Sequence, residues 1–130
     1  MTLETASPIL IVDDYGTMLK IMRNLLKQLG YENVDDASNG AAALEKVQAK
    51  QYHLIISDWN MEPMTGYELL IKVRQSANNA TTPFIMVTAE SKSENILAAR
   101  KAGVSNYLVK PFNAVTLKAK IDQVFGQRAA

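Results

Sequence analysis

The chain contains no cysteine, which excludes disulfide bonds and cysteine-ligated zinc. It also lacks any apolar stretch close to the roughly 20 residues that a membrane-spanning helix needs. Residues 1–7 have neither the basic start nor the apolar core of a signal peptide. These absences predict a soluble, cytoplasmic protein that does not bind membranes.

The chain also lacks an excess of charge of either sign. It has 14 basic and 13 acidic residues, which give a formal net charge of +1. Such a balance gives no overall attraction to nucleic acid or to anionic lipid. No repeat and no low-complexity linker divides the 130 residues, a length typical of one domain with one core. We therefore expect a single domain over residues 1–130, with its core in about residues 8–126 and frayed tails outside it.

Short apolar runs alternate with amphipathic stretches along the chain. Runs without polar alternation are typical of strands buried on both faces, and hence of parallel sheets. Gly30, Gly103 and Gly126 are expected to end the first, fourth and fifth helices, and Ser91 with Glu94 fits a capping box for the fourth. The strands are expected at residues 9–12, 34–37, 54–57, 83–88 and 107–109. Five such strand and helix units predict a doubly wound α/β fold.

Three of these strands end on chemically reactive side chains. Asp13 and Asp14 follow the first strand, Asp58 follows the third and Lys110 follows the fifth. Ligands of such sheets bind beyond the carboxyl ends of the strands. The three acids and the lysine are therefore expected to converge on one pocket.

Charge repulsion determines what this pocket can hold. Unit charges ~4 Å apart repel by roughly 1 kcal/mol in water and by about 4 kcal/mol at an effective dielectric constant near 20, so the three carboxylates require a proton or a cation. An all-oxygen site with two or three protein ligands suits a hydrated magnesium ion better than calcium. Asp13, Asp14 and Asp58 are therefore the predicted metal ligands.

Lys110 supplies a mobile cation that can pair with Asp58 or with a phosphoryl oxygen. Thr88 ends the fourth strand with a hydroxyl, and the backbone N–H of Ala89 follows it. Together with a metal, these donors could stabilise the three equatorial oxygens of a phosphoryl group in transfer. The Asp58 carboxylate would then be the nucleophile and would form an acyl phosphate.

With these residues in place, the chain resembles the receiver domains of two-component response regulators. Among them it is most similar to the single-domain chemotaxis receivers of the CheY type, which implies a flavodoxin-like sheet of five parallel strands in the order 2-1-3-4-5 with five helices. The similarity covers essentially the whole chain and depends on motifs that occur together in the family's order and spacing. They are Asp13-Asp14, Asp58-Trp59-Asn60-Met61, Thr88-Ala89-Glu90, Tyr107 and Lys110-Pro111-Phe112.

By this resemblance, Asp58 accepts a phosphoryl group from a sensor histidine kinase. Magnesium is bound by Asp14, Asp58 and the backbone carbonyl of Asn60, with Asp13 acting through water. The strand-end threonine and lysine contact the phosphoryl group. The resemblance thus implies a switch that catalyses only its own phosphorylation and dephosphorylation, and not an enzyme with a separate substrate.

The resemblance also implies how the signal leaves the site. Thr88 is coupled to Tyr107, and output passes through the face of the fourth helix, fifth strand and fifth helix to a downstream protein such as the flagellar motor switch. Asn60 and Glu90 occupy positions that tune the loss of the phosphoryl group, and both match the short-lived chemotaxis type. The Lys110–Pro111 bond is commonly cis in such domains. A phosphatase is a further implied partner, and a monomer is the default state.

Some local features carry separate expectations. Glu62 stands where many family members have proline, and Pro63 follows it, so the loop after Asp58 is expected to differ in shape. Trp59 is expected to be partly exposed and to report metal binding, and His53 is expected to be structural. Basic residues outnumber acidic ones in the last forty residues. They either face solvent or form a docking surface for an acidic partner.

Other functions stay open as alternatives. The domain could be a phosphate sink, a relay shuttle or a phosphate-independent docking module, although the last would be expected to have lost an acid, the lysine or the threonine. A magnesium-dependent aspartyl phosphatase would need an aspartate where Asn60 stands. A flavin-binding domain would need a phosphate loop after the first strand, where Asp13 and Asp14 would repel phosphate. DNA binding is not expected, because no segment resembles a helix-turn-helix.

Overall fold

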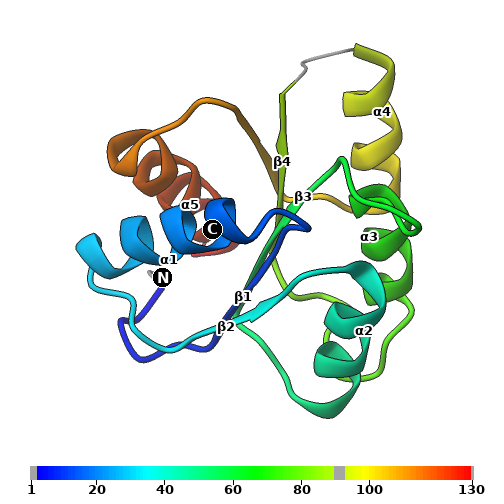
Figure 1. Cartoon of the computed structure of the whole chain (residues 1–130), viewed down its shortest axis with the longest axis horizontal. Helices are drawn as coiled ribbons and strands as arrows, with labels where there is room; N and C mark the ends of the chain where they lie inside the picture. Colours follow the sequence, from blue (N-terminus) through cyan, green and yellow to red (C-terminus); the bar gives the residue numbers. More distant parts are fainter. Residues whose placement is uncertain (1–2, 90–92, 130) are drawn as a thin grey trace.

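The computed structural model describes residues 3–89 and 93–129, and strand and helix alternate along them (Figure 1). This alternation confirms the predicted doubly wound α/β fold. The strands are β1 (Ile9–Val12), β2 (Val34–Ala37), β3 (Leu54–Asp58), β4 (Phe84–Thr88) and β5 (Asn106–Val109). The helices are α1 (Gly16–Gln28), α2 (Gly40–Ala49), α3 (Gly66–Arg74), α4 (Ser93–Ala102) and α5 (Ala114–Ala129).

All five strands are parallel and form one sheet in the order β2-β1-β3-β4-β5, the order that the family resemblance implies. Winding reverses between β1 and β3, the place where such sheets open a crevice for a ligand. The register pairs Val12 with Ser57 and Asp58 with Val87. The ends of β1, β3 and β4 therefore lie together at one edge of the sheet.

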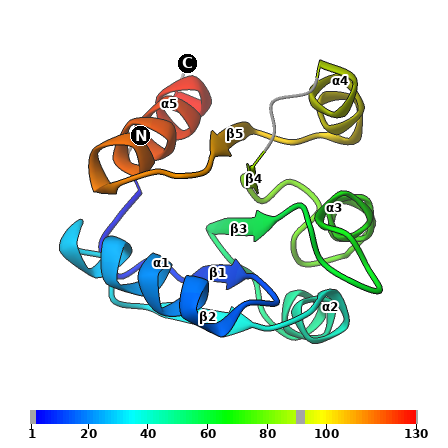
Figure 2. The ribbon, with the colours of Figure 1, turned by 45° about the horizontal axis from the view of Figure 1, so that its top comes forward.

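Helices cover both faces of the sheet, which explains why its strands lack polar alternation. Figure 2 shows α1 and α5 on one face of the sheet and α2, α3 and α4 on the other. Ile9 and Ile11 of β1 pack in the layer of α1 and α5, whereas Leu10 and Val12 pack in the layer of α2, α3 and α4. All four side chains are fully buried. Within the described residues, no helix combines the length and the apolar character that crossing a membrane would need.

Glycine ends two of the helices but not the last one. Gly30 follows α1 with a φ of 96° and Gly103 follows α4 with a φ of 97°, the left-handed conformation that stops a helix. Gly126 does not have a positive φ, and α5 continues through it to Ala129. The predicted end of this helix at Gly126 is therefore wrong, because a glycine stops a helix only where the backbone turns left-handed.

The N-terminal segment packs on the core instead of fraying. Leu3 is buried in the same cluster as Tyr31, which follows α1, and Phe125, which belongs to α5. The Asn33 side chain donates to the Ala6 carbonyl at 3.0 Å. The expected tail is therefore wrong for residues 3–7, since Leu3 packs in the core with Phe125 and a hydrogen bond holds Ala6 to Asn33, just before β2.

The fourth strand begins one residue later than the sequence predicted. β4 begins at Phe84, directly after Pro83, which has no N–H to donate to the sheet. α4 begins at Ser93. The predicted N-cap, Ser91, lies outside the described residues.

Candidate functional site

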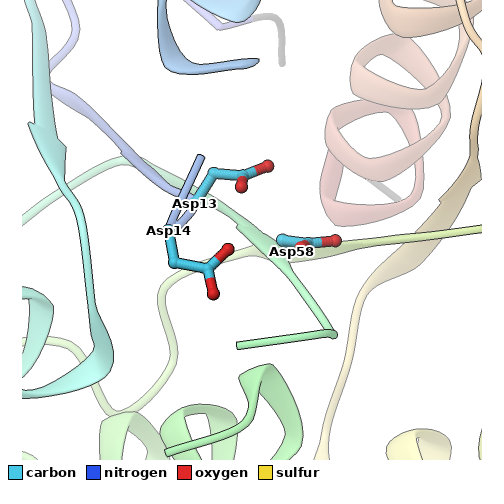
Figure 3. Close-up of side chains that lie close together, drawn as sticks. All are labelled: Asp13, Asp14 and Asp58. Carbon is cyan, nitrogen blue, oxygen red and sulfur yellow. The ribbon is translucent and has the colours of Figure 1, made fainter. Parts of the chain in front are cut away.

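Three carboxylates meet beyond the carboxyl ends of β1 and β3. Asp13 and Asp14 follow β1 directly, and Asp58 is the last residue of the neighbouring strand β3. Each acid offers a carboxylate oxygen within 4.8 Å of those of the other two (Figure 3). No other group of three potential metal ligands occurs among the residues that the structure describes. The predicted convergence of these acids is confirmed.

Two oxygens of this cluster are buried without a hydrogen bond from the described residues. Asp13 is 1% exposed and Asp58 is 3% exposed, whereas Asp14 faces solvent. The Tyr15 N–H donates to Asp13 Oδ1 at 3.0 Å. Asp13 Oδ2 and Asp58 Oδ1 are buried and accept no hydrogen bond from any described residue. Buried acceptors in folded proteins are nearly always satisfied, so two orphaned carboxylate oxygens in one cluster fit a hard divalent cation.

Lys110 reaches the acids from the end of β5. Its Nζ lies 3.1 Å from Asp58 Oδ1 and 3.7 Å from Asp13 Oδ2, as ion pairs that lack the geometry of hydrogen bonds. The Lys110 N–H donates to the Thr88 carbonyl at 2.8 Å, which fixes the lysine backbone to the end of β4. The side chain is 25% exposed, so its flexible stem can carry the charge from Asp58 to a ligand that enters from solvent.

The environment disfavours the charged form of both buried acids. Burial raises the pKa of Asp58 above its ordinary value, and the charge of Asp13 raises it further, while Lys110 opposes both effects. Burial also raises the pKa of Asp13, although the hydrogen bond from the Tyr15 N–H and the charge of Lys110 act to lower it. A divalent cation would lower both pKa values, because it favours the ionised carboxylates.

The other predicted residues lie on β4 and β5. Thr88 is buried at the end of β4, one residue beyond the pairing partner of Asp58. Ala89 follows it and is exposed, whereas Glu90 lies outside the described residues. Tyr107 on β5 is half-buried against the core layer of α2, α3 and α4, and burial raises the pKa of its hydroxyl. The fold thus brings Thr88 to the edge that carries the acids and leaves Tyr107 on the next strand.

The loop after Asp58 is fixed where it begins and where it ends. The Trp59 N–H donates to the Val87 carbonyl at 2.8 Å, and the Gly66 N–H donates to the Trp59 carbonyl at 2.9 Å. Trp59 is partly exposed, as predicted, and stacks on Tyr67 with ring centroids 5.6 Å apart. Asn60, whose carbonyl is a predicted metal ligand, is exposed between these fixed points.

Two peptide bonds before proline are cis near the site. The cis form of Lys110–Pro111 confirms what the family resemblance implied. Glu62–Pro63 is also cis, which the sequence did not indicate. This second bond lies where the chain departs from the family's usual proline position.

Two features at the start of α3 escaped the sequence analysis. A β-carbon on Gly66 would lie 2.2 Å from the Asp58 carbonyl oxygen, so only glycine allows α3 to begin this close to the acid. Thr65 and Glu68 form a reciprocal capping box that fixes the same start. The pattern Thr-x-x-Glu before an apolar helix could have revealed the box. No local pattern reveals the Gly66 contact, because it joins a helix to the strand before the loop.

Comparisons with known sequences agree with this arrangement. The family described as response regulator receiver domain matches residues 9–122. The chemotaxis protein CheY-3 of Vibrio cholerae is 44% identical over 117 residues, which cover 90% of this chain and 90% of that protein. The chemotaxis protein CheY of Pseudomonas aeruginosa is 45% identical over 117 residues, which cover 90% of this chain and 94% of that protein.

Solved structures show the same similarity in space. The chemotaxis protein CheY4 of Vibrio cholerae superimposes with a TM-score of 0.86 at 36% identity, covering 92% of this chain and 98% of that one. The receiver domain of the sensor histidine kinase PA1611 of Pseudomonas aeruginosa, solved with a magnesium ion coordinated in its active site cleft, gives a TM-score of 0.83 at 26% identity. That match covers 93% of this chain and 98% of the other.

Proposed function

This chain belongs to the response regulator receiver domain family as a CheY-like receiver, and we propose that it is a phosphorylation switch whose acceptor is Asp58. The donor in this proposal is the phosphohistidine of a sensor histidine kinase. The domain would catalyse its own phosphorylation and dephosphorylation and would turn over no separate substrate. Two of its relatives are named as chemotaxis proteins, so a chemotaxis pathway is the proposed setting.

The observation that carries the proposal is the pair of buried, unsatisfied oxygens Asp13 Oδ2 and Asp58 Oδ1 beside Lys110. An ion pair with a purely structural role would direct the lysine at one carboxylate and satisfy it. Here a single ammonium is shared between two acids at 3.1 Å and 3.7 Å. Such a cluster keeps an excess of negative charge that a divalent cation would relieve, and its lysine is available to a phosphoryl group.

The reaction can be written with the residues of this edge. An Asp58 carboxylate oxygen attacks the phosphorus atom while the bond from phosphorus to the histidine nitrogen breaks. Asp58 becomes an acyl phosphate, and the released imidazole takes up a proton. Lys110 moves from the carboxylate to one phosphoryl oxygen, and the Thr88 hydroxyl and the Ala89 N–H donate to the others.

Magnesium is the cation that we propose for the acid cluster. Asp14, Asp58 and the Asn60 carbonyl would hold it, with Asp13 acting through water. When bound, the ion would neutralise the carboxylates and the oxygens of the incoming phosphoryl group. The orphaned oxygens of the cluster support this assignment, as does the receiver domain of PA1611, which has magnesium in its cleft.

Signal output would leave through the surface of α4, β5 and α5. In the described part of the chain, these elements contribute three of the five exposed large hydrophobic side chains, namely Leu97, Val109 and Val115. Arg100 and Lys101 lie exposed in the last turn of α4. Exposed apolar and basic groups together fit an acidic, partly apolar segment of a downstream protein, such as the flagellar motor switch.

In the proposed switch, Thr88 couples the acid cluster to the output surface of α4, β5 and α5. Its hydroxyl would move toward the phosphoryl group, and Tyr107 would then change orientation and alter the output surface. Asn60, and Glu90 outside the described residues, would set how fast the phosphoryl group is lost.

Intact mass after incubation with acetyl phosphate and magnesium tests the acceptor. Wild type is expected to gain one phosphoryl group that is lost over time, whereas Asp58→Asn and wild type with EDTA gain none. Trp59 fluorescence on addition of magnesium and beryllofluoride gives a second readout. If wild type gains no mass and its fluorescence does not respond, the switch is wrong and phosphate-independent docking becomes the leading account.

A binding experiment separates the motor output from the other roles of a receiver. Purified motor switch protein would be titrated with wild type in the presence and absence of beryllofluoride. Binding that needs beryllofluoride supports the motor output. Absence of binding, together with transfer of the phosphoryl group to a histidine phosphotransfer domain, would instead identify a relay shuttle.

A further inference from the structure

The strand that Asp13 and Asp14 follow ends between two loops, because β1 lies between β2 and β3 in the sheet. The loop after β2 leads into α2 at Gly40, and the loop after β3 leads into α3 at Gly66. Both helices cover the same face of the sheet (Figure 1). The Met64 side chain joins the two loops: a β-carbon on Gly40 would lie 2.8 Å from its Cβ, 2.9 Å from its Cγ and 2.6 Å from its Sδ.

We propose that this contact between Gly40 and Met64 positions the loop that carries Asn60, and thereby sets the affinity of the acid cluster for magnesium. The inference rests on the proposed function, which assigns the Asn60 carbonyl to the metal. It adds two positioning residues that touch neither the metal nor the phosphoryl group.

The contact constrains the backbone of the loop and not only a side chain. The Sδ and Cγ atoms of Met64 can swing to another rotamer, but its Cβ is placed by the backbone of residue 64. Carbon atoms pack best about 3.5–4.0 Å apart, so a β-carbon on residue 40 at 2.8 Å from Met64 Cβ would force the loop or α2 to move. Glycine at position 40 therefore allows the loop to lie closer to α2 than any other residue would.

The loop side of the contact is short and leads directly to Asn60. Met61 is 2% exposed and packs in the core layer of α2, α3 and α4, and the two residues after it are exposed. Met64, half-buried, is the next side chain that packs inward. A shift of the loop at Met64 would therefore be transmitted through a few residues to the carbonyl of Asn60.

The helix side of the contact is held firmly. The Asn39 side chain caps α2 by accepting from the Ala42 N–H at 2.7 Å. The Ala37 carbonyl, at the end of β2, accepts from the Asp13 N–H at 3.2 Å. Gly40 thus lies between a capped helix turn and a residue that is bonded to Asp13, so Met64 packs on a fixed surface next to the acids.

Gly40→Ala tests the contact directly. Gly40 does not have a positive φ and alanine is the better helix former, so the backbone tolerates the change and any loss must come from Met64. Overpacking of this kind is expected to weaken magnesium binding, measured by calorimetric titration, by about fivefold or more. Gly126→Ala is the matched control, because its β-carbon would meet nothing within 4 Å, and its magnesium affinity should equal that of wild type.

A double-mutant cycle shows whether Met64 causes the effect. Met64→Gly removes the three atoms that lie nearest to a β-carbon on residue 40. In that background, Gly40→Ala is expected to change the magnesium affinity by less than about twofold, so the two substitutions are strongly non-additive. An equal loss in both backgrounds would overturn the proposal.

Two readouts distinguish positioning from general destabilisation. In metal-free Gly40→Ala protein, the changes in amide chemical shift should concentrate in residues 59–66 and at the start of α2. At saturating magnesium, the rate of phosphorylation by acetyl phosphate should return to within about twofold of wild type. Shift changes spread over the whole sheet, or a rate that magnesium does not restore, would contradict a positioning role.

The titrations also separate this inference from the function on which it rests. If wild type binds no magnesium, the proposed function fails and the positioning role fails with it. If wild type binds magnesium and Gly40→Ala binds it equally well, only the positioning role fails.

Discussion

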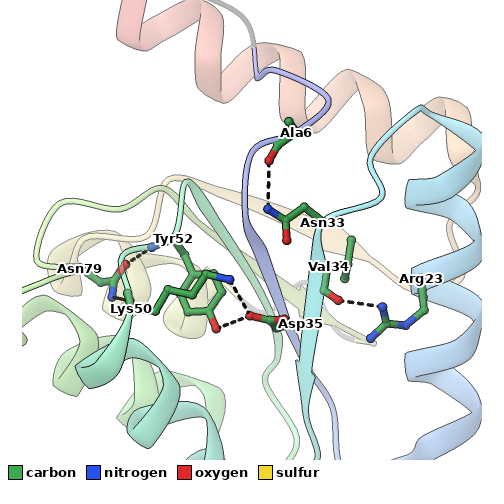
Figure 4. Close-up of polar contacts among 8 residues, drawn as sticks. All are labelled: Ala6, Arg23, Asn33, Val34, Asp35, Lys50, Tyr52 and Asn79. Atoms are coloured by element: carbon green, nitrogen blue, oxygen red, sulfur yellow. Dashed lines mark hydrogen bonds and ion pairs between the residues drawn. The ribbon is translucent and has the colours of Figure 1, made fainter.

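Two regions of this domain bury polar side chains and treat them in opposite ways. The acid cluster of Asp13, Asp14 and Asp58 keeps buried oxygens that accept no hydrogen bond from the described residues. What we call the Asn79 network, formed by Asp35, Lys50, Tyr52, Asn79 and Thr82, leaves no polar atom of the Asn79 side chain unbonded. Figure 4 shows its members other than Thr82. The acids lie at the carboxyl ends of β1 and β3, whereas Tyr52 and Thr82 precede β3 and β4.

The bonds of Asn79 show what a satisfied buried group looks like. Its Oδ1 accepts from the Tyr52 N–H at 2.7 Å and from the Thr82 hydroxyl at 2.9 Å. Its Nδ2 donates to the carbonyls of Val47 at 2.6 Å and Lys50 at 2.8 Å. These bonds tie α2 to the starts of β3 and β4. The comparison teaches that a buried polar group indicates structure where it is satisfied and points to a ligand where it is not.

The largest change in stability is expected from breaking the satisfied region. Asn79→Ala removes four hydrogen bonds and leaves a buried N–H and buried carbonyls without partners, so the free energy of unfolding should fall by about 3 kcal/mol in urea denaturation. Asn78→Ala is the matched control, because this neighbour is exposed and donates one bond to the Gln48 carbonyl. If the free energy of unfolding falls equally little in both variants, the Asn79 network does not stabilise the fold as expected.

A substitution in the acid cluster is expected to change the free energy of unfolding by a smaller amount and in the opposite direction. Asp58→Asn removes a buried charge that burial and Asp13 disfavour, so without magnesium it should raise the free energy of unfolding at neutral pH by about 1–2 kcal/mol. The pKa of Asp58 is raised in the folded state, so the charge destabilises the fold above that pKa. The gain should therefore shrink as pH falls toward the ordinary value of 3.8, where both folded and unfolded carboxyls take up protons.

Magnesium provides the control for this second prediction. Bound to the folded acid cluster as proposed, the metal should stabilise wild type and narrow the difference in unfolding free energy between wild type and Asp58→Asn. Thermal or urea unfolding of both proteins with and without magnesium measures this. A destabilised Asp58→Asn in metal-free buffer would show that Lys110 satisfies the cluster better than the ion-pair distances indicate.

The smallest change is expected where the satisfied region reaches solvent. Burial opposes the ionisation of Asp35, but hydrogen bonds from Tyr52 at 2.7 Å and Lys50 at 3.1 Å outweigh it and lower its pKa. Asp35→Asn should therefore cost about 0.5–1 kcal/mol at neutral pH, a value reduced by solvent screening because the Asp35 side chain is 36% exposed.

The effect of Asp35→Asn on the free energy of unfolding depends on pH with the opposite sign to that of Asp58→Asn. A lowered pKa gives stability that is present above the ordinary value of 3.8 and is lost as pH falls through the folded-state pKa. The cost of Asp35→Asn should vanish over that range in a series of urea titrations. Asp36→Asn, next in the strand and paired with Arg23 in a more exposed salt bridge, should change stability by less than about 0.5 kcal/mol.

The acid cluster could be predicted from the sequence because each of its residues directly ends a short apolar run. In a parallel sheet, a strand end fixes the place of the next residue, so Asp13, Asp58 and Lys110 needed no long-range information to be placed together. The family resemblance supplied the strand order and the cis bond before Pro111, which local patterns do not encode.

The Asn79 network could not be predicted, because its partners are remote in sequence. Asn79 lies 27 residues from Tyr52 and 32 from Val47, and an asparagine in a loop usually indicates only a turn. The close contacts of Gly40 with Met64 and of Gly66 with the Asp58 carbonyl could not be predicted for the same reason. A glycine in a sequence shows that the backbone is free to turn there, but not which side chain occupies the space that its missing β-carbon leaves.

The packing of the N-terminal segment has a consequence for how this domain can be rearranged. Leu3 and Phe125 of α5 line one cavity together with Tyr52 and Pro83, the residues that lead into β3 and β4. The beginning and the end of the described chain therefore meet at the edge of the sheet opposite to Asp58. A short linker across this meeting point would turn the polypeptide into a nearly closed ring, so a circular permutant opened in an exposed loop should keep the fold. A fluorescent protein fused at either end would lie on the far side of the domain from Asp58.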